Sequence, residues 1–175
     1  MAELHIIGQI VGASGFPHNR LFCVWEATAG GGWTLLQGDN EGQTQVDNPE
    51  IDDFALWSHP LDLHYATRGI QGWPKLTFQV WNYDDYNRTQ IFAYGVCDIP
   101  TTPGEHKIEC VTWRPVGGLW ERIMRFFLGG GPQLRNTAVV RDCANRHRLY
   151  TQSMGIVHLE LGIIVRGFEN FGVEF

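Results

Sequence analysis

Four segments of the chain alternate apolar and polar residues with a period of two, the pattern of half-buried β-strands. In the first, Leu4, Ile6 and Ile10 share one face with Gly8, and intervening residues such as His5 form the other face. The other three segments cover 21–26, 76–81 and 157–166. Because successive strand residues point to opposite sides, each segment offers one apolar face to a core. The alternation therefore predicts an all-β fold.

Glycine and proline clusters separate the alternating segments. Gly30-Gly31-Gly32 stands between segment 21–26 and the apolar run 33–36, which predicts a β-hairpin there. The stretch 73–100 contains a strand, a polar acidic loop, a second strand and a proline stop, and it predicts a long hairpin. With no alternation of strands and helices, we expect an antiparallel β-sandwich of about eight strands in one domain, residues 1–175. Its most motif-dense part is 2–118, and 154–166 is the expected final strand.

One stretch, 119–150, departs from this pattern. Its first part, 119–128, has apolar residues at helical spacing and ends at three glycines, so it predicts a short helix before the last strand. An arginine-rich connection follows. The apolar face of the helix either packs against the sandwich or contacts a partner or membrane, and the spacing leaves both alternatives open.

The acidic loop of the long hairpin lies where C2-type sandwiches carry calcium-binding aspartates. Asp84 and Asp85 could each supply a carboxylate, but Asn82 places an amide where a carboxylate would be expected. The opposing loop, 14–20, has no acidic residue and contains Arg20. Calcium needs about six to eight oxygen ligands from converging loops. We therefore expect a turn or a protein contact at this loop, with no metal bound.

No arrangement typical of a catalytic or cofactor site occurs in the sequence. Cys143 and His147 are four residues apart, and His59 and His64 flank Pro60, but neither pair has a second pair at zinc-site spacing. The chain has no GxSxG motif, no phosphate-binding loop and no dinucleotide fingerprint. The scattered cysteines are expected to be buried thiols. We predict a non-enzymatic protein without a cofactor.

The charge is unevenly distributed along the chain. The formal net charge is −6, which argues against nucleic-acid binding. Residues 114–148, however, hold seven arginines and two acidic residues, whereas 39–53 hold six acidic residues and no lysine or arginine. Such a split suits contacts with unlike partners. The candidate partner-binding residues are Arg135, Arg141, Arg146, Arg148, Trp120, Phe126, Phe127, Asp84 and Asp85.

The N-terminus lacks a basic start followed by a long apolar run, so we expect no secretory signal and an intracellular, cytoplasmic protein. Two functions remain open from the residues. The first is a structural module that binds other proteins through its charged surfaces. The alternative is a calcium-independent phospholipid-binding C2-like domain that uses 119–128 and the arginines against acidic headgroups.

Several motifs make the chain resemble the B9-domain family from end to end: GQIVGASGF, EGQTQVD, WSHPLDLHYAT, GWPKLTFQVW, TWRPVG, GGGPQL and GFENFGVEF. The resemblance implies a divergent C2-like sandwich without catalytic residues. It also implies a subunit of a tectonic-like complex at the ciliary transition zone, which gates membrane-protein entry. The implied partners are B9 domain-containing protein 1 and the Meckel syndrome type 1 protein, with tubulin or a membrane surface as further candidates. The implied location is the cilium base, including basal body and axoneme, and the centrosome.

Overall fold

The computed structural model of the 175-residue chain describes residues 1–51, 53–84, 86, 88–117, 134, 140 and 149–172. These residues form nine strands and a short 3₁₀ helix, η2 (Phe168–Phe171). The strands are β1 (Ala2–Ser14), β2 (Leu21–Thr28), β3 (Trp33–Gln37), β4 (Glu41–Gln43), β5 (Phe54–Thr67), β6 (Lys75–Tyr83), β7 (Thr89–Asp98), β8 (Gly104–Pro115) and β9 (Thr151–Arg166). The prediction of an all-β antiparallel fold with about eight strands is confirmed.

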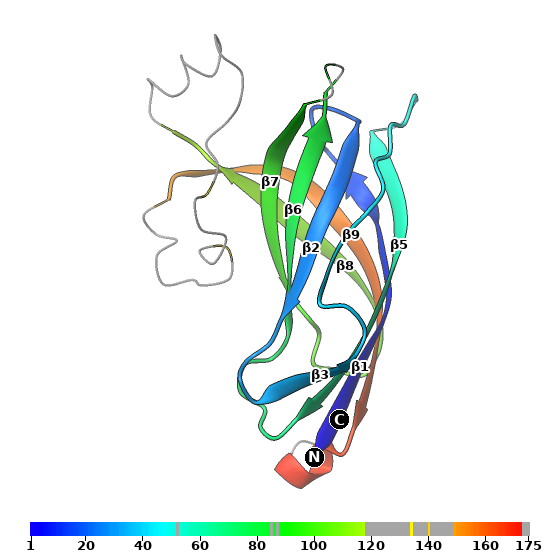
Figure 1. The fold of residues 1–175 in the computed structure, drawn as a ribbon, viewed down its shortest axis with the longest axis vertical. Helices are drawn as coiled ribbons and strands as arrows, with labels where there is room; N and C mark the ends of the chain where they lie inside the picture. The colour runs from blue at the N-terminus through cyan, green and yellow to red at the C-terminus, as the bar shows by residue number, and fades with distance from the viewer. Residues whose placement is uncertain are drawn as a thin grey trace.

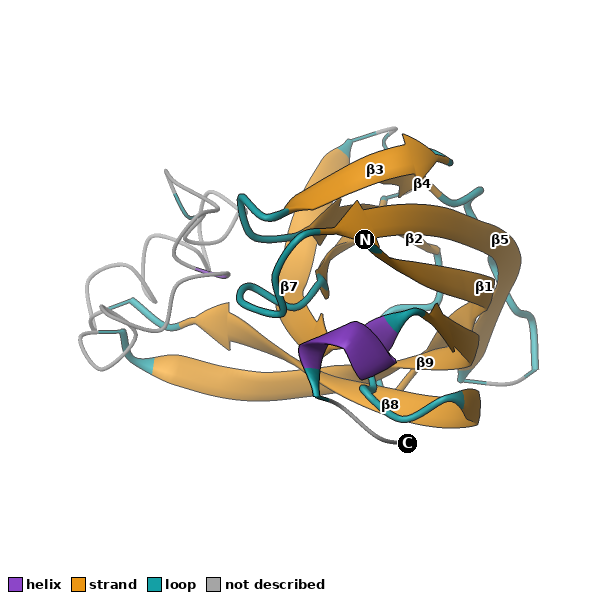
Figure 2. Cartoon of the chain, turned by 90° about the horizontal axis from the view of Figure 1, so that it is seen from below, coloured by secondary structure: helices purple, strands orange, loops and turns teal. Residues whose placement is uncertain are grey.

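All nine strands belong to one antiparallel sheet, in the order β3-β5-β1-β9-β8-β7-β6-β2-β4. Most of the long strands run roughly along the long axis of the molecule, whereas β3 lies across it (Figure 1). Seen end-on, the sheet curls so that β3 and β4 lie opposite β8 and β9 (Figure 2). β7 and β8 pair over only two residue pairs, Tyr94–Trp113 and Gly95–Thr112. This short pairing is where the layer containing β1 passes into the layer containing β6.

The core fills the space inside the curled sheet. The predicted inward residues of β1, Leu4, Ile6 and Ile10, are fully buried. On the facing layer, Leu76 and Phe78 of β6 are likewise fully buried. Burial of a large apolar side chain stabilises a fold by about 1.5–3 kcal/mol, so these facing rows dominate the stability. The period-two reading of these strands is therefore confirmed.

The predicted hairpin across Gly30-Gly31-Gly32 is wrong. β2 pairs with β6 and β4, whereas β3 pairs with β5 at the other edge of the sheet. The reason is the burial of Trp33, which packs edge-on against Trp73 with ring centroids 5.2 Å apart and also contacts Phe168 of η2. The Trp33 indole N–H donates to the Gln71 carbonyl at 3.1 Å. This aromatic cluster closes one end of the molecule, and it draws β3 across to β5.

Two glycines, Gly30 and Gly72, allow the chain to cross from β2 to β3 at this end of the molecule. The Gly30 N–H donates to the Gly72 carbonyl at 2.7 Å. A Cβ on Gly30 would lie 2.8 Å from the Gly72 Cα, closer than packed atoms can stay. Gly72 also has φ +75°, which favours glycine. The glycines that suggested a tight hairpin therefore permit a close approach between two distant segments.

Other predictions of local structure are confirmed. β6 and β7 pair from Lys75–Asp98 to Tyr83–Thr89, as the long hairpin required. The final strand extends over Thr151–Arg166 and so begins three residues before the predicted 154.

The predicted helix 119–128 lies outside the described residues. Within the described part of the chain, no helix has the length and apolar character needed to cross a membrane.

Three of the cysteines, Cys23, Cys97 and Cys110, are buried and carry free thiols, as expected; Cys143 lies outside the described residues. Burial raises the pKa of the Cys97 thiol to about 11 and that of Cys110 to about 12. It raises the pKa of Cys23 further still. These thiols therefore stay protonated at neutral pH, where they act as small apolar core residues.

A first prediction concerns the close approach of β1 and β9. A Cβ on Gly8 would overlap the backbone carbonyl oxygen of Glu160, whereas a Cβ on Gly31 would meet nothing within 4 Å. Gly8→Ala should lower the free energy of unfolding by about 3 kcal/mol, because backbone atoms of a paired strand cannot move aside. The matched control Gly31→Ala should change it by less than about 0.5 kcal/mol. Urea unfolding of both variants checks this, and equal stabilities would contradict the packing described.

Candidate interaction surface

A groove of about 850 Å³ lies on the outer face of the layer formed by β5, β1, β9 and β8. Its lining comes from all four strands: Ile7, Gly8, Gln9, Ser58, Pro60, Glu105, His106, Lys107, Glu160, Leu161, Gly162 and Ile164. The strand register explains the site, because residues directly opposite in neighbouring strands share a face. Ile7 of β1 faces Gly162 of β9, which in turn faces Glu105 of β8. We call this surface the outer groove.

The centre of the outer groove is apolar and open to solvent. Ile7 is 48% exposed and Ile164 is 55% exposed, although both belong to long central strands. Gly162 lies directly opposite Ile7 and two residues before Ile164, and it has no side chain to fill the hollow. Exposed branched aliphatic side chains in a hollow lose apolar hydration when a partner covers them.

A row of polar side chains crosses one side of the outer groove. The Gln9 amide donates to Glu160 Oε2 at 3.1 Å, and Lys107 Nζ lies 3.0 Å from Glu160 Oε1. The hydrogen bond from Lys107 holds the pKa of the Glu160 carboxyl below its ordinary value, and the same bond raises the pKa of Lys107. The row therefore keeps its charges at neutral pH. Its carboxylate and ammonium can orient a partner without leaving an unpaired charge.

The opposite side of the outer groove has an irregular backbone. The pairing of β1 with β5 shifts register between Ile10 and Gly12. Ser58 lies in the shifted part of β5 with φ +45°, a conformation that non-glycine residues adopt rarely. Bulges of this kind redirect strand residues and occur often beside functional sites.

The Asp84 loop has the hydrogen bonding of a turn. The Asp84 carboxylate accepts hydrogen bonds from the backbone N–H groups of Tyr86 at 2.9 Å and Arg88 at 2.8 Å. Its other oxygen accepts from Arg88 Nε at 2.9 Å. The pKa of this carboxyl lies below its ordinary value, chiefly because the Arg88 backbone N–H donates to it. The stabilising bonds of the loop are therefore present above the ordinary carboxyl pKa, and they are lost only as pH falls through the lowered value.

The loop opposite Asp84 is basic, as expected from its sequence. The Arg20 guanidinium lies 5.1 Å from the centre of the Tyr83 ring, and the Tyr83 N–H donates to the Arg20 carbonyl at 2.9 Å. The cation of Arg20 thus lies beside the loop in which calcium ligands would be needed. Asp84 is engaged by its own turn, and Asp85 lies outside the described residues.

The structure leaves the predicted partner-binding residues of 119–150 undescribed. Trp120, Phe126, Phe127, Arg135, Arg141, Arg146 and Arg148 lie outside the described residues. Leu134, Val140, Leu149 and Tyr150 of this stretch are described, and the first two make informative contacts. Val140 is buried in a second apolar cluster with Ile91 and Tyr94, and the Leu134 N–H donates to the Tyr94 hydroxyl at 3.1 Å. These two contacts place parts of the connection against β7.

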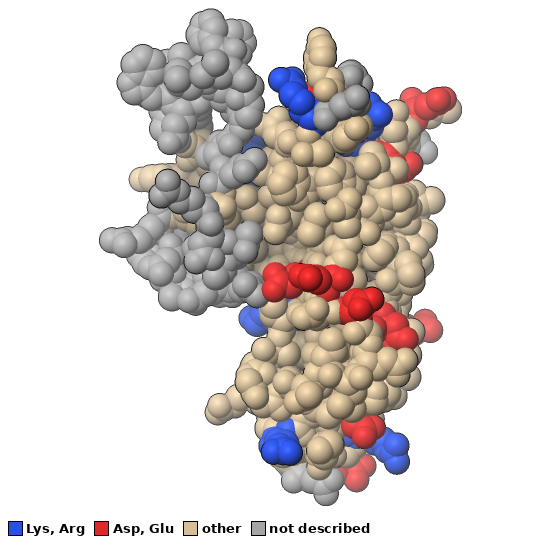
Figure 3. All heavy atoms as spheres, viewed as in Figure 1, with Lys and Arg blue, Asp and Glu red and all other residues tan. Residues whose placement is uncertain are grey.

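Charged side chains are unevenly distributed over the described surface. On the face viewed in Figure 3, acidic side chains form a band across the middle, and basic side chains lie mainly towards the two ends, where some acidic side chains also occur. Glu26 of β2 and Glu41 of β4 are direct cross-strand neighbours.

Sequence reasoning missed both the outer groove and the pairing of His5 with His64. The alternation predicts that His5 and Ile7 point outward, but it does not tell which strand lies next to β1. In the structure His5 faces His64 of β5 and Ile164 of β9. Ile7 and Ile164 are apolar residues on otherwise polar strand faces, and this is the sequence signal that could have indicated the outer groove.

The family model and the sequence relatives that match this chain point to one family. The family model described as "Ciliary basal body-associated, B9 protein" (B9-C2) matches residues 4–164. B9 domain-containing protein 2 of Danio rerio is 56% identical and that of Homo sapiens 53% identical, each over 174 residues and 99% of both chains. B9 domain-containing protein 1 of Mus musculus is 23% identical over 98% of this chain and 85% of its own length.

Among solved structures, the C2A domain of plant Extended Synaptotagmin 1 is similar, with a TM-score of 0.47, 12% sequence identity and coverage of 95% of this chain and 96% of that one. The family match extends over nearly the whole sheet, from β1 to β9, and the relatives match beyond it at both ends. The chain therefore belongs to the B9 family of ciliary basal body-associated proteins.

Proposed function

We propose that the chain is a non-enzymatic structural subunit of a tectonic-like complex at the ciliary transition zone. In this role it binds other B9-domain proteins, namely B9 domain-containing protein 1 and the Meckel syndrome type 1 protein. It thereby supports cilium assembly and the gating of membrane-protein entry. The observation that carries this proposal is the identity of 53–56% over 99% of the chain with B9 domain-containing protein 2 of human and zebrafish.

The outer groove supports binding of a folded protein. Its apolar centre and its paired polar row combine the two features of a protein interface, a core that excludes water and a polar rim. Both lie on long central strands, so a partner would meet a surface that is already ordered. Preordered surfaces lose little conformational entropy on binding.

We propose that a second, charged surface of the protein binds a second partner. The arginine-rich segment 114–148 and the acidic segment 39–53 have opposite charges. Related subunits with such charge patterns can associate through unlike surfaces, which generates a heterologous assembly. The match to B9 domain-containing protein 1 supports an assembly built from related domains.

The test of the outer groove is the double variant Ile7→Asp/Ile164→Asp. It should weaken co-purification with a B9 domain-containing protein 1 by about 10-fold or more, because covered carboxylates would lack partners. Folding should be retained because both side chains are about half exposed. The control Ile70→Asp changes an isoleucine that is 38% exposed and lies outside both the groove and the charged segments, and it should bind like the parent. Unchanged binding by a folded double variant would remove the groove from the interface.

The basic segment is tested by the triple variant Arg141→Glu/Arg146→Glu/Arg148→Glu. Charge reversal should weaken co-purification with a second B9-domain protein, and raising the salt concentration should weaken the parent complex in the same direction. Survival of the complex at physiological salt would exclude these arginines from the interface.

Flotation of the parent protein with vesicles containing phosphatidylserine distinguishes the alternative function. We expect no flotation; salt-sensitive flotation that the triple variant loses would instead support a phospholipid-binding domain.

A further inference from the structure

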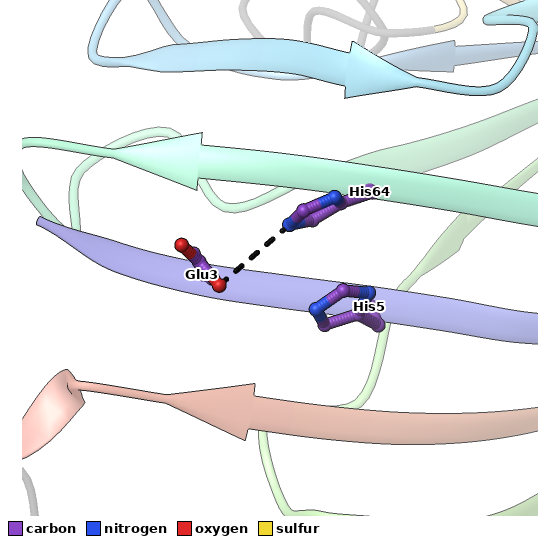
Figure 4. Close-up of side chains that lie close together, drawn as sticks. All are labelled: Glu3, His5 and His64. Atoms are coloured by element: carbon purple, nitrogen blue, oxygen red, sulfur yellow. Dashed lines mark ion pairs between the residues drawn. The ribbon is translucent and has the colours of Figure 1, made fainter.

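Three side chains with metal-binding atoms meet on the outer face of the sheet, next to the outer groove. Glu3 and His5 come from β1, and His64 comes from β5 (Figure 4). One ligand atom from each of the three residues lies within 4.8 Å of the others. All three side chains are partly buried, so they are neither freely mobile on the surface nor closed off from solvent.

The strand register creates this cluster. His5 and His64 are directly opposite in the antiparallel pair β1–β5, and Glu3 lies two residues from His5 on the same face of β1. The two imidazole rings are stacked, with centroids 3.9 Å apart and 17° between their planes. Glu3 Oε2 lies 3.9 Å from His64 Nε2, the pair that the dashed line joins in Figure 4. Two strands therefore bring two ring nitrogens and one carboxylate oxygen close together.

One atom of the cluster lacks a hydrogen-bond partner. His64 Nε2 is buried and neither donates nor accepts a hydrogen bond within the described part of the chain. A buried polar atom without a partner destabilises a fold, because it has lost its hydrogen bonds to water and gained none in return. The nearest carboxylate oxygen, at 3.9 Å, is beyond hydrogen-bond range. A metal ion between the three groups would satisfy this nitrogen and the Glu3 carboxylate together.

We propose that Glu3, His5 and His64 bind a divalent transition metal, with zinc as the ion that fits best. Two imidazoles and one carboxylate form a known type of three-residue zinc set, which leaves a fourth position open. Zinc bonds of about 2.0–2.2 Å place ligand atoms roughly 3.3 Å apart, so ligand atoms that now lie within 4.8 Å of one another must close by up to about 1.5 Å when the ion binds. Water or a donor atom from a bound protein would occupy the fourth position.

Calorimetric titration of the full, metal-free chain with zinc chloride tests the proposal. We expect saturable binding of one zinc ion per chain. His64→Gln and His5→Gln should each weaken it by at least about 10-fold, the lower end of the loss seen when even supporting groups of a metal site are removed. Glu3→Gln should weaken it as well. The matched control His18→Gln changes an exposed histidine on a distant loop and should leave the affinity unchanged.

Cobalt(II) provides a second readout that does not depend on heats. Bound to the full chain, it should give the strong visible absorption of a four-coordinate site, and His64→Gln should abolish that absorption. Circular dichroism of each variant without metal verifies folding. The proposal is overturned if the parent binds no zinc, if binding is unsaturable, or if His18→Gln lowers the affinity as much as His64→Gln does.

Discussion

The structure depends on the register of β1 between β5 and β9. β1 pairs with both strands over nearly its whole length, and its inward residues Leu4 and Ile6 are fully buried. Because side chains alternate with a period of two, a slip of one residue would turn this apolar row to solvent and bury His5 and Ile7. The burial of one face of β1 therefore fixes what the other face presents.

That other face carries both of the sites inferred from the structure. The same register places His5 opposite His64 and Ile7 beside Gly162. It also brings Gln9 next to Glu160, which begins the polar row that reaches Lys107 on β8. The candidate metal site and the outer groove are thus neighbours on one rigid, hydrogen-bonded surface. A protein that acts by holding partners gains from such a surface, since it need not become ordered on binding.

The sequence predicted the strands well because local alternation reports directly on burial. β1, β6 and β9 have the inward residues that their alternation indicated, and the long hairpin of β6 and β7 was found from its turn residues. The partner of β3 could not be found in this way. Its pairing with β5 depends on the packing of Trp33 with Trp73 and Phe168, residues 40 and more positions away. Glycines at 30–32 are compatible with a hairpin and with a crossing, and only the tertiary contacts decide between them.

The functional surfaces show the same division between local and distant information. The turn chemistry of Asp84 could be read from the chain, and the structure shows its carboxylate bound by its own loop. The outer groove and the Glu3–His5–His64 cluster join residues from strands far apart in sequence, so neither could be assembled from spacing. The basic residues Arg135 to Arg148 remain a prediction from charge alone.

We propose that the protein binds another B9-domain protein through the outward face of β1 and β9. Isoleucine-methyl NMR of the labelled chain during addition of a B9 domain-containing protein 1 tests it most directly. If this face is the interface, the methyl signals of Ile7 and Ile164 shift or broaden, while that of Ile70, which is 38% exposed and lies outside the groove, does not. Binding that leaves Ile7 and Ile164 unperturbed would show that the partner binds elsewhere.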